Sequence, residues 1–393
     1  MLLPLALAAA AAAGQPTLPP RPAVVAALAD LRRNQAVLLG KADVIGEFND
    51  TARKYDLHKT GPRGRDFTNK MCWAPDRKRA LFCGANHAVP HRLNDVWEFD
   101  LPSLTWSMLY APDLPRGYAD LGKDTSDVEF KDGVLVTKRG GPAVIAHTWW
   151  GLTYDPKRRE LLFMNTWVTD QKKAVRDLGG DPAALYAGPP LWAFNPAART
   201  WRPFRSPRPY PVPIFGGMLE YVPELGGSVW HANNWQMRGS WLHDFEKDTW
   251  TDLKSNGGGK AFEAEAPEPE QVGYYDPGRK LLVVHRHHTT HHYDVKANAW
   301  RKVLAGDKDD GRTPYGHDAR AVFYHDPASG HGLLVQFQTN TVWAYDPDRV
   351  AWTKLTPQGD PMPTGGKRLG YVDPALNALV VIDGTTVWAY RYR

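Results

Sequence analysis

Short runs of Val, Leu, Phe, Tyr and Trp, each closed by Asp-Pro, Gly or Asn, recur along most of the chain. Residues 319–355 contain four such runs, which predicts four antiparallel β-strands joined by tight turns. Asp326-Pro327 and Asp346-Pro347 mark the first and third turns, because proline fixes φ and aspartate accepts hydrogen bonds from the amides that follow it. One such sheet cannot bury both of its faces, so it needs copies of itself on either side.

The copies are marked by a tryptophan in the last strand of each sheet. These tryptophans are Trp106, Trp201, Trp250, Trp300 and Trp352, at steps of 95, 49, 50 and 52 residues. The period is therefore about 50 residues. The first step is longer and includes two insertions, residues 111–146 and 166–190. The pattern predicts small antiparallel sheets stacked radially around one axis.

Upstream of each tryptophan stand an aromatic-Asp-Pro turn, a Leu/Val run and a strand that ends in Tyr-Asp or a similar pair, as at Tyr154-Asp155-Pro156 and Tyr275-Asp276-Pro277. In this order of features the chain resembles the kelch-repeat and galactose-oxidase-like β-propellers over residues 51–393, although their Gly-Gly doublet is absent. The resemblance implies an all-β, kelch-like β-propeller. It implies no particular activity, because propellers host unrelated chemistries.

The last copy, residues 368–393, stops before its tryptophan strand. A ring of sheets must not leave an unpaired edge, so we expect an N-terminal strand to complete the C-terminal blade. Residues 52–57 are the candidate, pairing beside residues 387–392, because Tyr55 stands 51 residues before Trp106. Six blades are favoured; seven result if residues 110–148 hold a degenerate blade.

The N-terminal region divides into two parts ahead of the propeller. Residues 1–14 are a Leu/Ala run that resembles a secretory signal peptide, and residues 15–50 form a Pro-rich spacer with a helix predicted from Pro22 to Gln35. The first run is too short to span a bilayer, and no later stretch is suitable. We therefore expect a secreted or periplasmic monomer without membrane insertion after signal removal.

Composition narrows the choice of partners. The chain has 48 basic and 43 acidic residues, a mild excess that favours anionic ligands. Basic runs interleaved with aromatic residues are absent from the sequence, so nucleic acid is not an expected partner. Two cysteines make no disulfide framework. Cys72 and Cys83 are expected as buried thiols, with a cross-strand disulfide as the alternative.

Polar and aromatic residues concentrate in the second-to-third turns of the blades and in the links between blades, which share one face of a propeller. Both insertions lie there, and the first includes a predicted hairpin from Val128 to Thr137. Aromatic faces beside amides and cations suit a sugar, so a glycan ligand is expected, with a protein ligand as an alternative. The predicted ligand-binding residues are Asn86, Trp149, Asn165, Trp167, Asn233, Asn234, Trp235 and Arg320.

A histidine-rich segment, residues 285–292, has five histidines in eight positions. Residues two apart on a strand point to the same side, so His285 and His287, with His288, are candidate ligands for a divalent metal such as Zn²⁺. The alternative is that these five histidines form a solvent-exposed turn without a metal.

Catalysis is the second hypothesis for the same face. His147, His87 and His317 are candidate acid–base groups, and Arg286 would stabilise an enolate-like intermediate, as in a polysaccharide lyase. A hydrolase would need a close carboxylate pair, and the turns of this face offer few carboxylates, chiefly Glu220, Glu270 and Asp318. A copper-radical oxidase is disfavoured, because both cysteines are assigned to the core. Glycan binding, a carbohydrate-active enzyme and a protein-interaction scaffold stay open.

Overall fold

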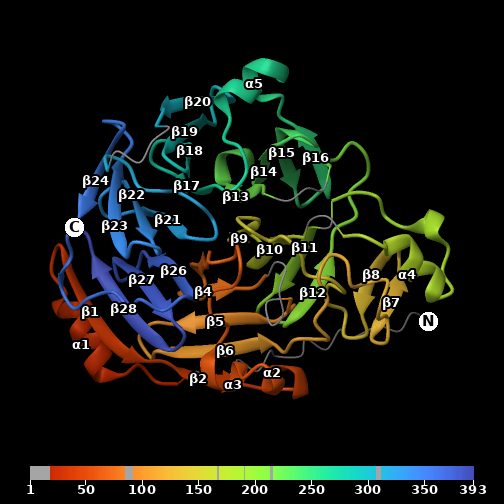
Figure 1. Ribbon diagram of the computed structural model, residues 1–393, viewed down its shortest axis with the longest axis horizontal. Helices are drawn as coiled ribbons and strands as arrows, with labels where there is room; N and C mark the ends of the chain where they lie inside the picture. Colours follow the sequence, from red (N-terminus) through yellow and green to blue (C-terminus); the bar gives the residue numbers. More distant parts are fainter. Residues whose placement is uncertain (1–17, 85–91, 166–167, 190, 213–215, 307–310) are drawn as a thin grey trace, which may run out of the picture.

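The computed structural model describes residues 18–84, 92–165, 168–189, 191–212, 216–306 and 311–393. Six antiparallel sheets surround a central axis as the blades of a β-propeller (Figure 1). The all-β, six-bladed prediction is therefore confirmed, and the extra length before Trp201 forms no seventh blade.

In blades 1 to 5 four strands run in sequence order, and the first strands of neighbouring blades contact one another around the axis. Blades 1 and 2 consist of β3 (Cys72–Ala74), β4 (Arg79–Phe82), β5 (Val96–Asp100), β6 (Thr105–Tyr110), β9 (Leu152–Asp155), β10 (Glu160–Met164), β11 (Leu191–Asn195) and β12 (Thr200–Pro203). Blades 3 and 4 consist of β13 (Met218–Val222), β14 (Gly227–Asn233), β15 (Arg238–Asp244), β16 (Thr249–Asp252), β17 (Val272–Asp276), β18 (Leu281–Arg286), β19 (Thr289–Asp294) and β20 (Ala299–Leu304). Blade 5 consists of β21 (Ala321–Asp326), β22 (His331–Gln336), β23 (Thr341–Asp346) and β24 (Ala351–Leu355), and blade 6 begins with β26 (Arg368–Asp373), β27 (Ala378–Asp383) and β28 (Thr386–Arg391).

Aspartate-led turns shape the blades as predicted. The Asp346 carboxylate accepts hydrogen bonds from the amides of Asp348 at 3.0 Å and Arg349 at 3.2 Å. Asp276 does the same for the amides two and three residues on. These side chains satisfy backbone donors that the strands leave unpaired.

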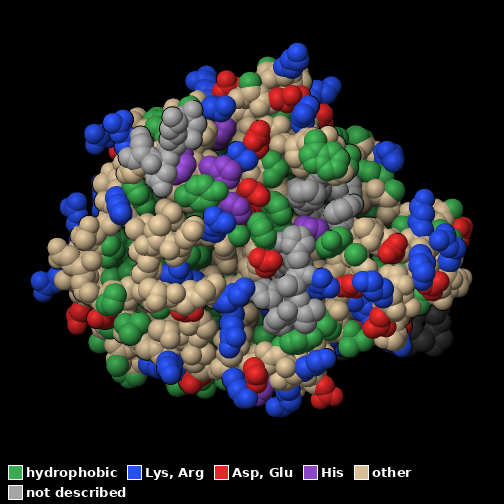
Figure 2. All heavy atoms as spheres, in the orientation of Figure 1, with side chains coloured by type: hydrophobic (Ala, Val, Ile, Leu, Met, Phe, Trp, Pro, Cys, Tyr) green, Lys and Arg blue, Asp and Glu red, His purple; other side chains and the backbone are tan. Residues whose placement is uncertain are grey.

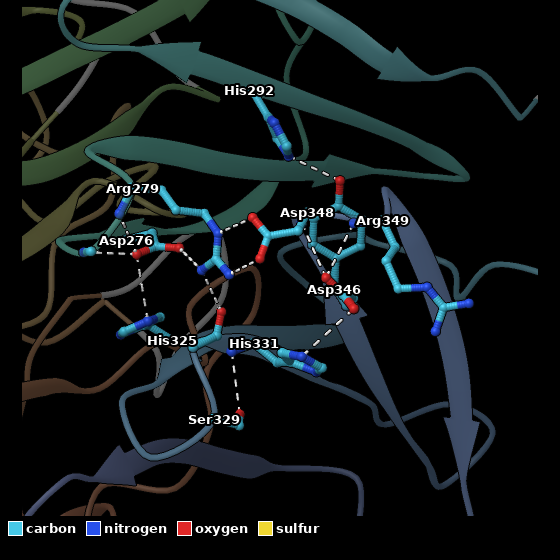
Figure 3. A network of polar contacts seen from close by, with 12 residues as sticks. Asp276, Arg279, His292, His325, Ser329, His331, Asp346, Asp348 and Arg349 are labelled. Atoms are coloured by element: carbon cyan, nitrogen blue, oxygen red, sulfur yellow. Dashed lines mark hydrogen bonds and ion pairs between the residues drawn. The ribbon is translucent and has the colours of Figure 1, made fainter.

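A polar network joins blades 4 and 5 at the end of the propeller where the turns of Asp276 and Asp346 lie (Figure 3). The Arg279 guanidinium donates to Asp276 at 2.8 Å, to the carbonyl of Gly330 at 2.8 Å and, through Nε, to Asp348 at 2.7 Å. Planar, five-donor arginine suits such a junction of three acceptors. The network thus fixes the relative position of the two sheets.

Two of the repeated tryptophans, Trp300 and Trp352, are hydrogen-bonded to the preceding sheet. Trp300 is fully buried on β20, and its indole nitrogen donates to Ser240 on β15 at 2.9 Å. Trp352 on β24 donates in the same way to Thr290 on β19 at 3.0 Å. In blades 4 and 5 the repeated tryptophan therefore makes a contact between blades.

The ring closes through an N-terminal strand, as predicted. β1 (Gln35–Lys41) pairs antiparallel with β28, from Gln35 opposite Arg391 to Lys41 opposite Thr386, with a register shift between Leu38 and Gly40. The short strand β25 (Gln358–Gly359) adds in parallel on the outer side of β1.

The predicted position of the closing strand was wrong. Residues 52–57 belong to two short helices, α2 (Asp50–Lys54) and α3 (Leu57–Thr60). The Asn49 side chain caps α2 by accepting from the amide of Ala52 at 2.9 Å, and such a cap favours a helix over a strand. The apolar run Val37-Leu38-Leu39 supplies the strand instead, because the predicted helix ends early, as α1 (Pro22–Asp30).

The segment from Arg21 to Gly46, which we call the N-terminal clasp, bridges the last blade and the first. After β1 the chain forms β2 (Asp43–Gly46), which pairs in parallel with β6 of blade 1. Arg391, at the end of β28, donates to the carbonyls of Leu28 and Leu31 in the clasp. Blade 6 and blade 1 are thus joined by one continuous stretch of chain.

The insertions around blade 2 form a small module beside the ring. The predicted hairpin is present as β7 (Val128–Lys131) and β8 (Val134–Thr137), and the second insertion supplies α4 (Gln171–Asp177) and a 3-10 helix (Pro182–Ala184). Asp132 and Gly133 both have positive φ in the hairpin turn, as Asp-Gly turns require.

Both cysteines are free and buried, which confirms the interpretation as core thiols. Burial raises the pKa of Cys72 to about 12, so this thiol stays protonated at neutral pH. No helix among the described residues has the length and hydropathy of a membrane span. The predicted signal peptide, residues 1–14, lies outside the described residues.

Replacing a blade tryptophan tests the contact between blades. We expect Trp300→Ala to lower the free energy of unfolding by about 3–5 kcal/mol, because it empties a buried site and removes one hydrogen bond to Ser240. Urea unfolding followed by circular dichroism measures this loss. Trp235→Ala is the control: its side chain is 73 % exposed, so a change below about 0.5 kcal/mol is expected. Equal effects of the two substitutions would contradict the assignment.

Candidate ligand-binding site

Six side chains meet near the axis on the face formed by the links between blades, and we call this group the axial site. Its members are Phe67, Trp149, Glu270, His287, Tyr315 and His317. Most precede the first strand of a blade, and His287 lies in the turn between β18 and β19. Figure 2, which views the molecule down its shortest axis, shows histidine side chains gathered with a few acidic ones near the middle of one face.

The first part of the axial site is a stack of aromatic rings. Trp149 lies on Phe67 with ring centroids 4.9 Å apart and an interplanar angle of 16°. The His317 imidazole lies 5.7 Å from Phe67. These three residues come from the links that precede blades 1, 2 and 5, so the stack exists only in the closed ring.

A second stack forms at blade 4. The rings of His287 and Tyr315 are 4.9 Å apart and nearly parallel, at 8°. Their backbones are joined by paired hydrogen bonds between His287 and Gly316, at 2.6 and 2.7 Å. His317 lies 6.1 Å from both rings and connects this stack with the first.

Glu270 lies between two imidazoles. Its Oε2 atom is 3.4 Å from Nε2 of His317 and 3.5 Å from Nε2 of His287. The amide of Ala319 donates to Nδ1 of His317 at 3.1 Å, which places the ring proton on Nε2, toward the carboxylate. Burial, and next the charge of Arg286, lower the pKa of His287, so this ring is neutral at neutral pH.

The Asp318 side chain is buried next to the His317 ring. Its Oδ1 atom is 3.2 Å from Nδ1 of His317, and its backbone carbonyl accepts from Asn69 at 3.0 Å. Burial raises the pKa of the Asp318 carboxyl to about 6, against the opposing effect of His317. The site therefore contains a carboxyl group that changes charge close to neutrality.

Several residues at and next to this site have a strained backbone. Phe67, His147, Trp149, Glu270 and His287 all have φ between 49° and 70°, a region that bulky residues rarely adopt. Each such conformation costs about 1–3 kcal/mol and persists only where the surrounding structure enforces it. Strain at several links that meet at one point favours a functional role for this part of the molecule.

Four predicted site residues lie at or next to the centre: Trp149, His147, His287 and His317. The ring of His147 is 5.1 Å from Tyr118 and 6.3 Å from Trp149. Two predicted arginines lie close by. Arg286 donates to the carbonyl of Pro269 at 2.8 Å and pairs with Glu268 at 3.0 Å, while Arg320 lies 5.9 Å from the Tyr315 ring centroid.

Other predicted ligand-binding residues have structural partners. Asn165 joins the amide of Ala146 to the carbonyl of Val144, and Asn233 donates to the carbonyl of Ala266 at 2.9 Å. Asn234 accepts from two amides of its own turn, in which Trp235 is exposed. Asn86, His87 and Trp167 lie outside the described residues.

The three candidate metal ligands each have a different environment. His285 is buried and uses both ring nitrogens, with Thr290 at 3.0 Å and the carbonyl of Pro314 at 2.9 Å. Burial lowers the pKa of His285 to about 3. His288 contacts Thr313, and His287 faces Glu270. Within the described part of the chain, no three His, Cys, Asp or Glu side chains are grouped so that they could hold a metal ion.

Phe67 and Tyr315 were not predicted, and Glu270 and Asp318 were noted only as carboxylates. The signal that could have found them is position, because each stands shortly before the first strand of a blade. Residues at that position end up near the axis in every blade.

Comparisons with known proteins assign no family to this chain. No protein-family model matches the chain, and no curated protein matches it. Among solved structures, the chain is similar to an auxiliary nutrient binding protein from Bacteroides ovatus at 9 % identity, with a TM-score of 0.49, over 91 % of this chain and 76 % of that one. A likeness this distant carries no information about the ligand of this chain.

The buried carboxyl of Asp318 predicts a specific pH dependence. Because its pKa is near 6 when folded and near 3.8 when unfolded, the native state binds the extra proton and loses stability as pH rises from about 4 to 6. We expect Asp318→Asn to be more stable than the wild type by about 1–3 kcal/mol at pH 8 and equal to it near pH 4. Urea unfolding across this range checks the difference, and a difference independent of pH would contradict the buried, protonated carboxyl.

Proposed function

We propose that this chain is an exported, kelch-like β-propeller that binds a carbohydrate at the axial site. The observation that carries the proposal is the meeting of two aromatic stacks with the Glu270 carboxylate between two imidazoles. The kelch-like repeat and the Leu/Ala-rich start of the sequence support the family and the export.

The chemistry of the axial site suits a sugar ring. The faces of Phe67 and Trp149 offer apolar surface for its C–H groups, while Glu270 accepts hydrogen bonds from hydroxyl groups. The Nε2 proton of His317 is available as a donor when Glu270 turns to the ligand. Arg320, stacked near Tyr315, is placed to meet a carboxylate or sulfate group.

A second candidate function is proton abstraction from an acidic sugar, as in a polysaccharide lyase. It is favoured by the position of Glu270 between His287 and His317, which allows a proton to move from ligand to protein. The Glu270 carboxylate would act as the base, oriented by the Nε2 proton of His317, and Arg286 would stabilise the negative charge that develops.

Removal of the aromatic surface tests the binding proposal. We expect Phe67→Leu and Trp149→Leu each to weaken glycan binding at least tenfold, because leucine keeps apolar volume but loses the flat ring. Glycan-array screening followed by calorimetry with the best ligand measures the change. Tyr275→Leu, at the opposite end of β17, is the matched control and should bind normally. A folded wild type that binds no glycan on the array, or binding that survives both axial substitutions, would contradict the proposal.

Removal of the proton acceptors tests the enzymatic candidate. If the chain is a lyase, it releases unsaturated product from an anionic polysaccharide, and His317→Gln and Glu270→Gln lower the rate at least a hundredfold while binding persists. Product absorbance in the ultraviolet reports the reaction. Binding of such polysaccharides without any unsaturated product would leave the binding function and eliminate the lyase.

A further inference from the structure

A cavity lies on the propeller axis, at the end opposite the axial site. Its rim includes Pro75 and Pro156, which follow the first strands of blades 1 and 2, whereas the axial-site residues precede the first strands. The cavity has a volume of about 300 Å³, near the lower end for small-molecule sites. A ligand of about one ring would fill it.

The inner end of this cavity holds a buried ion pair. The Lys70 ammonium contacts the Glu220 carboxylate, donates to the carbonyl of Leu219 at 3.3 Å and lies 5.1 Å from the centroid of the Trp150 ring. The side chains of Lys70 and Glu220 are only 5 % and 12 % exposed. Among the described residues that line the cavity, these two are the charged ones, and they neutralise each other.

An ionic ligand is disfavoured by this arrangement. A ligand with one net charge would attract one partner and leave the other buried without compensation, which is costly. An uncharged ligand can instead hydrogen-bond to the pair while the pair stays intact. The ammonium supplies donors and the carboxylate supplies acceptors at adjacent positions.

The walls of the cavity are aromatic and held in place. Lining rings include Trp73, Tyr154, Tyr221 and Tyr324. The Tyr324 hydroxyl accepts from the amide of Met71 at 2.9 Å and donates to the carbonyl of Gly370 at 2.6 Å, and the Tyr154 hydroxyl donates to Asp76. Because these hydroxyl groups are engaged by protein, the rings present mainly apolar surface to a ligand.

We propose that this cavity is a binding site for an uncharged monosaccharide. The C–H face of the sugar ring packs on the aromatic walls, and neighbouring hydroxyl groups bond to Lys70 and Glu220. A flat heterocycle such as a nucleobase would also suit the walls and carries a donor next to an acceptor, so nucleobases are the competing ligands in the titration. The site is separate from the axial site, so it does not depend on the function proposed there.

Titration with small neutral sugars tests the proposal. Glucose, galactose, mannose and xylose are titrated into the full chain and followed by saturation-transfer NMR, beside adenine, uracil and tryptophan. We expect saturable binding of at least one sugar and about tenfold weaker binding by Tyr221→Leu, which removes a half-buried ring of the wall. The double variant Lys70→Met/Glu220→Leu should abolish binding and stay folded, because apolar residues of similar size replace a buried ion pair without penalty.

Trp235→Ala, whose exposed side chain lies outside both sites, is the control and should leave this binding unchanged. Sugar binding lost in Trp149→Leu but kept in both cavity variants would overturn the proposal and assign the sugar to the axial site. No saturation by any of the four sugars, or tighter binding of adenine, uracil or tryptophan, would also overturn it. If the double variant does not fold, Tyr221→Leu alone decides.

Discussion

The pairing of β1 with β28 is the constraint on which the rest of this molecule depends. Without β1, the last blade would expose the backbone donors and acceptors of β28 along one edge, and edges of that kind are prone to mispairing. The N-terminal clasp covers this edge and continues into blade 1 through β2. Arg391 strengthens the junction by donating to carbonyls of the clasp. Backbone pairing between the two ends of the chain therefore holds six sheets in one ring.

Closure of the ring also sets the geometry of the axial site and of the cavity at the opposite end. Phe67 and His317 are 250 residues apart in sequence, yet their rings meet at 5.7 Å because the links before blades 1 and 5 end at the same axis. Ring closure likewise brings Lys70 and Glu220 together at the opposite end of the axis. Phe67, Trp149, Glu270 and His287 have positive φ, and Lys70 and Glu220 carry buried charges. Packing of the closed ring supplies the free energy that holds these residues in place.

Features set by nearby residues were predictable from the sequence. The meeting of residues from distant segments near the axis was not. An Asp-Pro turn depends on residues a few positions away, and a buried tryptophan such as Trp300 contacts a residue about one period away. The spacing of these features therefore revealed the blades. The closing strand was misplaced because residues 35–41 and 52–57 are both short and partly apolar, and the cap at Asn49 decides between them. His285 and His287 were expected on one side of a strand. β18 ends at Arg286, and the φ of 50° at His287 breaks the alternation, so the two rings diverge.

Hydrogen exchange in blade 6 tests the closed ring most directly. The amides of β27 and β28 should exchange as slowly as those of β22 and β23 in the full chain, and should become fast in a chain that lacks residues 18–41, because their sheet loses its outer strand. Mass spectrometry of the exchanged peptides measures both chains under the same conditions. Unchanged protection of β28 in the shortened chain would show that the ring does not depend on β1, and would contradict this account.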